Sequence, residues 1–238
     1  MPEPARNPAK PPAETETGLA IRLDGISKSF GYRDALRGVT LEIPHGTCLA
    51  VFGPNGAGKS TLARIVATQW APTSGRGEIL GHEIGRGNLR IRARSGMVAD
   101  QSFLRSELSL EENLSFFRSA YRVPEGSRSD ELLERFGLES RRKDAVSTFS
   151  QGMVKRANLI RSLLHDPDLW ILDEPFGGLD EEGKDLLKEC IVDYSRAGRT
   201  VLLVTHLREI GEGLATASVE LEDGCLTRTS GLGKEASK

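Results

Sequence analysis

The sequence lacks the features that mark disulfide-rich or membrane-spanning chains. It contains only three cysteines in 238 residues, Cys48, Cys190 and Cys225, and they form no CxxC pair. So few and so widely spaced thiols predict neither a disulfide framework nor a thiolate metal site, and we expect buried thiols in a reducing cytosol. The longest clearly apolar run, Cys48 to Phe52, is far shorter than the ~20 residues that a membrane helix needs.

Neither sign of charge is in excess. The chain has 32 Lys and Arg against 34 Asp and Glu, a formal net charge of -2, and aromatic residues make up only 5%. No global positive potential therefore attracts nucleic acid, and we expect no nucleic-acid partner. Arg90, Arg92 and Arg94 alternate with apolar residues, which we interpret as a solvated face of one element rather than as a nucleic-acid-binding stripe.

The two ends differ in composition from the middle of the chain. Residues 1–18 hold five of the eleven prolines among small and charged residues, which predicts a disordered tail. This tail has no apolar stretch of the kind that a secretory signal requires. We expect residues 19–230 to form one domain and residues 231–238 to form a polar tail.

Buried strands and amphipathic helices alternate through the middle of the chain. Residues 48–52, 169–172 and 201–204 are short, fully apolar runs, typical of strands buried on both faces of a parallel sheet. Alternating apolar residues near 19–23 and 41–43 predict half-buried strands, and Asp223-Gly224 predicts a terminal hairpin. Residues 102–155 contain two predicted helices, 114–121 and 130–136, and no apolar strand. The pattern predicts an α/β fold with a helical insertion.

A glycine-rich segment directly follows the strand at 48–52. It consists of Gly53, Pro54, Asn55, Gly56, Ala57, Gly58, Lys59 and Ser60, which matches G-x-x-x-x-G-K-[ST]. Such a loop binds phosphates through its backbone N–H groups, Lys59 reaches the outer phosphates, and Ser60 offers a hydroxyl to Mg²⁺, with Thr61 as a further hydroxyl. A turn that only joined strand to helix would need neither the lysine nor the hydroxyl at this spacing.

Acidic and imidazole groups follow two other predicted strands. Asp173 and Glu174 come directly after residues 169–172, which suits Asp173 as the Mg²⁺-side group and Glu174 as the base for the attacking water. His206 follows the strand at 201–204, where an imidazole can hydrogen-bond the γ-phosphate. Hydrolysis is therefore favoured over transfer to a second substrate.

These motifs resemble those of the ATP-binding cassette (ABC) ATPases from about Leu19 to Arg228. In the family's order they are Phe30 as the adenine-stacking aromatic, with Tyr32 as its rival, 53–61 as Walker A, Gln101 as the Q-loop, 149–153 as the signature, 169–174 as Walker B, 178–180 as the D-loop, and His206 as the switch histidine. The resemblance implies a P-loop NTPase fold with a RecA-like parallel core, an antiparallel β subdomain and a helical insertion.

The resemblance also implies an activity and partners. The chain would hydrolyse ATP with Mg²⁺, with Gln101 as a sensor of water and γ-phosphate that also approaches the metal. It would pair as a homodimer or with another cassette, and Ser150, Gly152 and Asp180 would contact nucleotide at the shared interface. Permease subunits in the membrane would be its partners, at the cytoplasmic face of the inner membrane.

The signature departs from the family's usual Leu-Ser-Gly-Gly-Gln. Gln151 replaces a glycine and Met153 a glutamine, whereas Ser150 is a good helix N-cap and Gly152 allows close approach to an anion. Asp100 stands where proline often precedes the Q-loop glutamine.

One subfamily shares further features with this chain. Residues 100–117 and the signature variant are similar to the haem-exporter ATPase of cytochrome c maturation, which implies haem export and permease docking near residues 103–110. Export of a drug, lipid or polysaccharide is the alternative. A soluble ABC protein acting on ribosomes or DNA is a further alternative, and the signature disfavours a P-loop kinase. Cargo and transport direction stay open.

Overall fold

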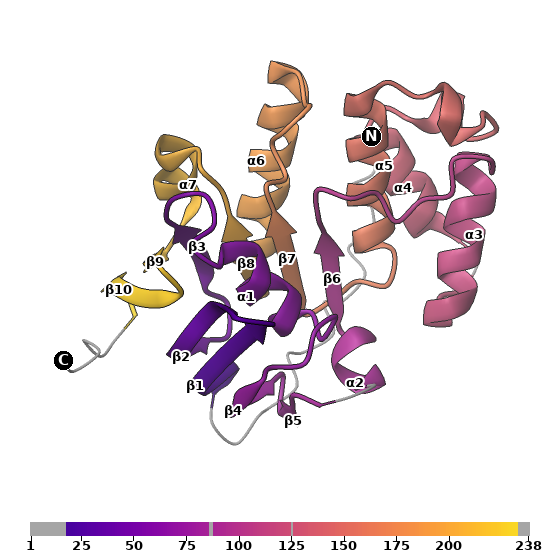
Figure 1. Cartoon of the computed structure of the whole chain (residues 1–238). Helices are drawn as coiled ribbons and strands as arrows, with labels where there is room; N and C mark the ends of the chain where they lie inside the picture. Colours follow the sequence, from indigo (N-terminus) through magenta and orange to yellow (C-terminus); the bar gives the residue numbers. More distant parts are fainter. Residues whose placement is uncertain (1–17, 86–87, 125, 233–238) are drawn as a thin grey trace.

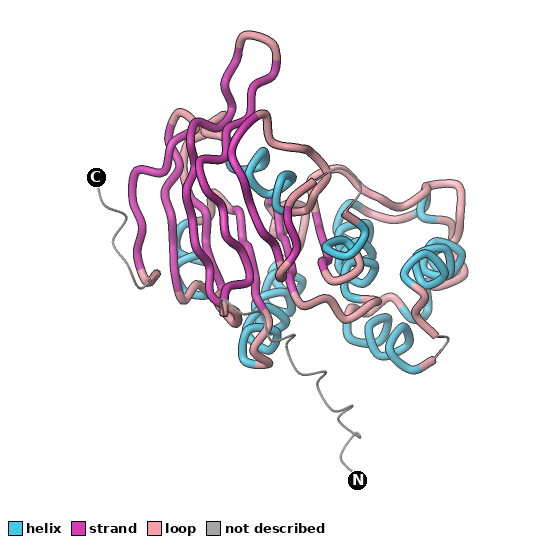
Figure 2. The backbone as a smooth tube through the Cα atoms, turned by 90° about the horizontal axis from the view of Figure 1, so that it is seen from below, coloured by secondary structure: helices cyan, strands magenta, loops and turns pink. Residues whose placement is uncertain are grey.

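The computed structural model describes residues 18–85, 88–124 and 126–232 (Figure 1). The predicted N-terminal tail lies outside the described residues except for Gly18, and of the predicted tail at 231–238 only residues 231 and 232 are described. Within the described part, two sheets lie on one side of the molecule and a group of helices lies on the other (Figure 2).

The larger sheet carries the predicted parallel core. Its strand order is β10-β9-β3-β8-β7-β6, with β10 alone antiparallel to its neighbour. The strands are β3 (Cys48–Phe52), β6 (Ser95–Val98), β7 (Leu169–Asp173), β8 (Thr200–Val204), β9 (Ala217–Glu222) and β10 (Cys225–Ser230). Every residue of β3, β7 and β8 is buried, as the apolar runs 48–52, 169–172 and 201–204 predict. Parallel alignment brings the carboxyl ends of these three strands to one edge of the sheet.

The smaller sheet is antiparallel, with the order β2-β1-β4-β5. Its strands are β1 (Leu19–Phe30), β2 (Arg33–Pro44), β4 (Ser74–Ile79) and β5 (His82–Glu83). Helix α1 (Lys59–Val66) lies between the two sheets (Figure 1), and its residues Leu62, Ala63 and Ile65 are fully buried in their common core. The core therefore fixes the helix that begins at the phosphate loop.

The predicted helical insertion, 102–155, contains α3 (Leu110–Tyr121) and α4 (Ser127–Arg135), and α5 (Gln151–Leu163) begins within it and extends beyond it. Helix α3 begins four residues earlier than the apolar spacing predicts. Ser109 accepts a hydrogen bond from the N–H of Glu112, and the Glu112 carboxylate accepts one from the N–H of Ser109. This reciprocal cap starts the helix before its first apolar repeat.

The remaining helical elements are the long helix α6 and several short ones. The short elements are α2 (Leu89–Arg92), α7 (Arg208–Leu214) and the 3₁₀ turns Glu139–Arg141 and Val146–Thr148. Helix α6 (Glu181–Arg196) begins at Asp180, whose carboxylate accepts from the N–H of Gly183 at 2.9 Å. Asp223 and Gly224 both have positive φ, 48° and 80°, and join β9 to β10 in the predicted hairpin.

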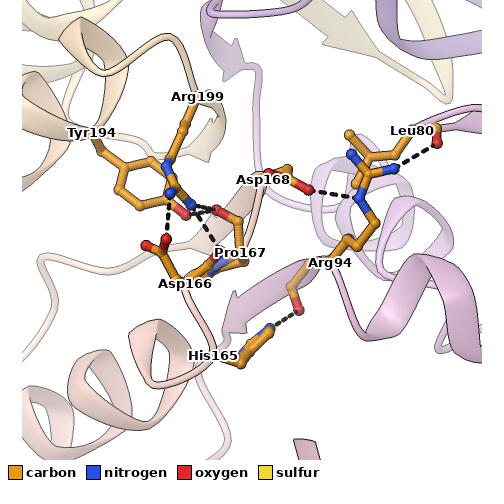
Figure 3. Close-up of polar contacts among 9 residues, drawn as sticks. Leu80, Arg94, His165, Asp166, Pro167, Asp168, Tyr194 and Arg199 are labelled. Carbon is orange, nitrogen blue, oxygen red and sulfur yellow. Dashed lines mark hydrogen bonds and ion pairs between the residues drawn. The ribbon is translucent and has the colours of Figure 1, made fainter. Parts of the chain in front are cut away.

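Two predictions about polar residues are wrong. Cys225 is exposed, whereas Cys48 and Cys190 are buried as expected. Of the arginines at 90–94, Arg90 and Arg92 are exposed as predicted, whereas Arg94 is partly buried and donates to the Asp168 carboxylate at 2.6 Å and to the Leu80 carbonyl at 3.2 Å (Figure 3). Arg92 likewise donates to the Thr68 carbonyl at 2.7 Å. Their partners are distant in sequence, so local alternation did not reveal them.

A polar cluster fixes the turn that leads into β7 (Figure 3). Arg199 donates to the carbonyls of Asp166 and Pro167 and to the Asp166 carboxylate, and the Tyr194 hydroxyl donates to the Pro167 carbonyl. Asp166 has a φ of 51°, an uncommon value for a residue other than glycine. These contacts hold β7 at its amino end, and the acidic pair follows at its carboxyl end.

His165 lies beside this cluster in a desolvated position. Its Nε2 is 3.1 Å from the Ser95 carbonyl, and its ring stacks on Tyr121 with a centroid distance of 3.9 Å. Burial, chiefly, lowers its pKa from 6.5 to about 4, and the nearby Arg161 and Arg128 act in the same direction. The folded protein therefore holds this imidazole neutral at pH values where the unfolded chain protonates it.

Acidification is expected to destabilise the fold through His165. Between pH 6.5 and 4 the unfolded chain binds the extra proton, so unfolding free energy falls as pH falls, by about 3 kcal/mol for this shift. His165→Phe removes the titrating group and keeps an aromatic ring beside Tyr121. Urea unfolding at pH 7 and pH 4.5 should show a smaller pH effect in the variant. An equal pH effect in both proteins would contradict the assignment.

Candidate functional site: a phosphate loop at the carboxyl edge of the parallel sheet

The glycine-rich segment lies between β3 and α1, in the predicted strand-loop-helix context. Gly58 directly precedes α1 with a φ of 104°, and a Cβ atom there would lie 2.3 Å from the Ala35 carbonyl oxygen. Gly53 has a φ of 143°, and a Cβ there would lie 2.0 Å from the Leu221 carbonyl oxygen. Both positions require glycine, because the loop passes directly against backbone of other strands.

Lys59 lies across the mouth of this loop. Its ammonium donates to the carbonyls of Gly53 at 2.8 Å and Pro54 at 2.9 Å, and the residue is only 7% exposed. The adjoining cavity has a volume of about 450 Å³. Its lining includes eight of the predicted site residues: Phe30, Asn55, Gly56, Gly58, Lys59, Ser60, Thr61 and Glu174. The cavity thus combines an aromatic side, a cation, hydroxyls and a carboxylate.

A hydroxyl and a carboxylate meet at the floor of the site. Ser60 donates to the Asp173 carboxylate at 3.0 Å, and Asp173 is 3% exposed. Burial raises the pKa of Asp173, and the hydrogen bond from Ser60 opposes that rise. These oxygen ligands suit Mg²⁺, which keeps waters and binds phosphate oxygens beside one or two protein groups. In the described ranges no group of three or more His, Cys, Asp or Glu residues could hold a metal ion.

Glu174 and His206 are brought together from β7 and β8. The Glu174 carboxylate is 2.8 Å from Nδ1 of His206. Glu174 has a φ of 49°, its N–H donates to the Val204 carbonyl at 2.9 Å, and its side chain lines the same cavity. The predicted base and the predicted γ-phosphate histidine are therefore neighbours, which adjacent parallel strands make possible.

The other predicted site residues lie outside this cavity. Gln101 is exposed in the loop after β6 and does not line this cavity. Ser150 accepts from the N–H of Met153 at 3.3 Å and caps α5, so that capping prediction is confirmed. Ser150, Gly152 and Asp180 do not line the cavity at the phosphate loop.

The signature and the D-loop are adjacent to each other instead. A Cβ on Gly152 would lie 3.0 Å from the Gly178 carbonyl oxygen, and Arg156 is 3.4 Å from the Asp180 carboxylate. Met153, one of the two departures in the signature, packs against the hydrophobic core beneath α5. Its substitution for glutamine is thus compatible with the helix packing.

The structure distinguishes the two aromatic candidates and adds one cation. Phe30 is 45% exposed, packs edge-on against Trp70 with centroids 5.0 Å apart, and lines the cavity, whereas Tyr32 does not line it. Arg33, which sequence reasoning missed, also lines the cavity and pairs with Phe30 across the β1-β2 hairpin. The short distance in sequence between Phe30 and Arg33 was the signal that could have predicted a hairpin and placed Arg33 beside Phe30.

Comparison with known proteins defines the class of this chain. The ABC transporter family matches residues 36–177. The chain belongs to this family, as an ATP-hydrolysing cassette that binds ATP. The predicted P-loop fold is confirmed by the structural neighbours, among them one described as the ATP-binding subunit of an ABC transporter, with a TM-score of 0.83, 29% identity and 90% coverage of both chains.

Two curated relatives indicate the surrounding group. The daunorubicin resistance ATP-binding protein DrrA3 of Streptomyces coeruleorubidus is 38% identical over 82% of this chain and 63% of its own length. The Nod factor export ATP-binding protein I of Rhizobium johnstonii is 37% identical over 90% of this chain and 70% of its own length. The chain thus spans somewhat under two thirds of the first relative.

A further structural neighbour is dimeric. It is a bacterial ABC transporter cassette with a TM-score of 0.82 and 26% identity, covering 90% of this chain and all of that one. The cassette fold of this chain therefore occurs in dimers. None of the helices in the described part of this chain is long and apolar enough to cross a bilayer.

Proposed function

We propose that this chain is the ATP-hydrolysing subunit of a membrane exporter and that it powers transport by separate permease subunits. The observation that carries the proposal is the convergence of three pairs at one sheet edge: the phosphate loop with Lys59, Ser60 with Asp173, and Glu174 with His206. Together they supply charge for phosphates, oxygen ligands for Mg²⁺ and a base beside a cavity.

Each side chain has a defined task in hydrolysis. Lys59 and the loop N–H groups stabilise charge on the β- and γ-phosphates. Ser60 and Asp173 would hold Mg²⁺, which would neutralise negative charge on the phosphates. The Glu174 carboxylate orients and deprotonates the attacking water, and His206 steadies that carboxylate and hydrogen-bonds the γ-phosphate. Gln101 joins the site from its exposed loop as a sensor of the γ-phosphate.

We propose that the site is completed by a second cassette. Ser150 and Gly152 form the amino end of α5, a thirteen-residue helix, and lie outside their own chain's nucleotide cavity. A helix amino end favours anions, so this end suits the phosphates of nucleotide bound to a partner. ATP would bridge two copies, and hydrolysis would remove the bridge.

Permease docking is proposed at the surface between the Q-loop and α3. A cavity of about 450 Å³ opens there, lined by residues including Phe103, Leu104, Arg105, Phe116 and Phe117. Phe103 is 37% exposed and Phe116 is 65% exposed, which is unusual for large apolar side chains. The surface includes residues 103–108 of the predicted docking segment 103–110 and lies just after Gln101 in the sequence, so a permease bound here would be close to the γ-phosphate sensor.

The cargo is proposed from the named relatives. Drug resistance and Nod factor export appear in the names of the two curated relatives, and haem export appears in neither. We therefore propose a drug or another secreted natural product in place of the haem suggested by residues 100–117 and 149–153. The peripheral position at the inner membrane follows from this role.

Affinity purification tests the transporter assignment. The Glu174→Gln protein, purified from detergent-solubilised membranes with MgATP present, is expected to retain polytopic membrane subunits, because the variant holds the nucleotide-bound state. The same protein purified with ADP is the matched control and should retain less permease. Recovery of cytochrome c maturation subunits with bound pigment would restore haem as cargo. Recovery of only ribosomal or DNA-associated proteins would overturn the transport function.

A further inference from the structure

A lysine on the signature helix contacts the backbone of the proposed general base. Lys155, on α5, donates its ammonium to the main-chain carbonyl of Glu174 at 3.2 Å. Helix α5 belongs to the helical insertion, whereas Glu174 follows β7 of the parallel core. The contact therefore joins the helical insertion to the parallel core beside the proposed base.

The peptide that accepts this hydrogen bond has an unusual conformation. Glu174 has a φ of 49°, in the left-handed region that side chains other than glycine rarely occupy. Its N–H is bound by the Val204 carbonyl at 2.9 Å, and its carbonyl is bound by Lys155. Two different elements, β8 and α5, thus hold the two polar groups of the residue in the orientation that places its carboxylate 2.8 Å from His206.

The side chain of Lys155 also borders a cavity beside α5. A cavity of about 490 Å³ lies between α5, the loop after β6 and the D-loop, and it is lined by Asp100, Ser102, Lys155, Asn158 and Gly178 among others. Lys155 borders this cavity, whereas Glu174 lines the cavity at the phosphate loop. In the described part of the chain, the Lys155 ammonium is the side-chain group that donates a hydrogen bond to the Glu174 carbonyl.

The charges around Lys155 suit a fixed cation. Burial lowers the pKa of its ammonium, and the negative charges of Asp100, Asp173 and Glu174 oppose that change. Asp100, the residue that precedes Q-loop Gln101 where the family often has proline, thus supplies an acidic neighbour to Lys155. The Lys155 ammonium is therefore attracted by Asp100 of the Q-loop and by the acidic pair at the end of β7, and it donates to the Glu174 carbonyl.

We propose that Lys155 is a positioning residue for Glu174, which holds the strained peptide of the base in place and ties it to the signature helix of the same chain. The proposal rests on the assignment of Glu174 as the base. Ser150 and Lys155 are five residues apart on α5, roughly 7.5 Å along the helix axis. A signature helix that moves when its amino end binds a partner's nucleotide therefore moves the ammonium that fixes Glu174.

Three substitutions at Lys155 test the role in the purified full-length protein. Lys155→Met removes the donor and keeps the aliphatic length, and we expect kcat for MgATP hydrolysis to fall about tenfold while KM stays within about twofold. Lys155→Arg and Lys155→Gln keep a donor, and each should recover at least half of the lost rate. Lys188→Met, which removes an exposed lysine paired with Asp185 on α6, is the matched control and should keep the wild-type rate.

The outcomes separate this role from a structural one and from failure of the base assignment. A purely structural lysine would lower the thermal midpoint or the affinity for ATP in Lys155→Met, with no recovery by Gln. A wild-type kcat in Lys155→Met, measured beside an inactive Glu174→Gln protein, would overturn the positioning role alone. A wild-type rate in Glu174→Gln would overturn the base assignment, and with it the role of Lys155.

Discussion

Replacement of Glu174 by Gln is expected to lower kcat for ATP hydrolysis by about 10²- to 10⁴-fold, the range that a positioned general base contributes. The amide is nearly isosteric with the carboxylate, and its oxygen still accepts a hydrogen bond from His206, now 2.8 Å from the carboxylate. The side chain therefore keeps its place and loses only its ability to take a proton from water. Phosphate release at saturating MgATP measures this effect.

ATP binding should survive the same substitution. Lys59, the loop N–H groups and the pair of Ser60 with Asp173 are unchanged, and these groups carry the affinity for phosphates and Mg²⁺. The loss of one negative charge beside the γ-phosphate favours nucleotide binding further. Calorimetric titration with ATP should give a Kd equal to or below that of the wild-type protein, and light scattering should show a dimer that persists with ATP.

A second carboxylate substitution separates the effect of losing the base from the effect of losing one negative charge. Glu189→Gln on the exposed face of α6 removes one carboxylate away from the cavity and should leave kcat unchanged. Wild-type turnover by Glu174→Gln would show that another group takes the proton. Loss of ATP binding together with turnover would instead show that Glu174 supports the loop.

The chemistry of the site was predictable wherever it is encoded in consecutive residues. An apolar run followed by Gly53, or by Asp173 and Glu174, predicts a buried strand and the groups at its carboxyl end. Parallel pairing of β3, β8 and β7 then places these groups at one edge. The helix caps at Ser150 and Asp180 were equally local, because each side chain bonds an N–H three residues later.

Contacts that depend on packing between distant segments could not be predicted. Arg94 lies 74 residues from Asp168, and Lys155 lies 19 residues from Glu174, and no periodicity links either pair. Likewise, Arg33 enters the nucleotide cavity only because the β1-β2 hairpin places it opposite Phe30. Cargo is the extreme case, since the residues that select it in a transporter of this class are expected on other chains.

Replacement of Trp170 by Ala is expected to cost about 3–5 kcal/mol of unfolding free energy, the range found for removal of a large aromatic side chain from a core. Trp170 is fully buried in β7, and its ring centroid lies 5.2 Å from that of Tyr194. Its indole N–H donates to the Ser162 hydroxyl at 2.9 Å. The same strand ends in the acidic pair, so loss of packing there affects both fold and site.

The Ser162 hydroxyl does not lose all of its hydrogen bonds when Trp170 is replaced by Ala, so little of the lost unfolding free energy comes from an unpaired polar group. It also donates to the Leu159 carbonyl at 2.7 Å, so it keeps a partner when the indole is removed. The expected loss is therefore mainly that of an unfilled cavity, and Trp170→Phe, which keeps most of the ring volume, should lose less than half as much. Far-UV circular dichroism during urea unfolding measures both variants without depending on tryptophan emission.

A second tryptophan gives the matched comparison. Trp70 is only partly buried, against Phe30 and the guanidinium of Arg64, whose centre is 4.7 Å from its ring. Trp70→Ala should therefore lose clearly less unfolding free energy than Trp170→Ala, although the same side chain is truncated. Equal losses in the two variants would mean that the parallel sheet and its helices tolerate a cavity at β7, and that the core around Trp170 does not limit the stability of this cassette.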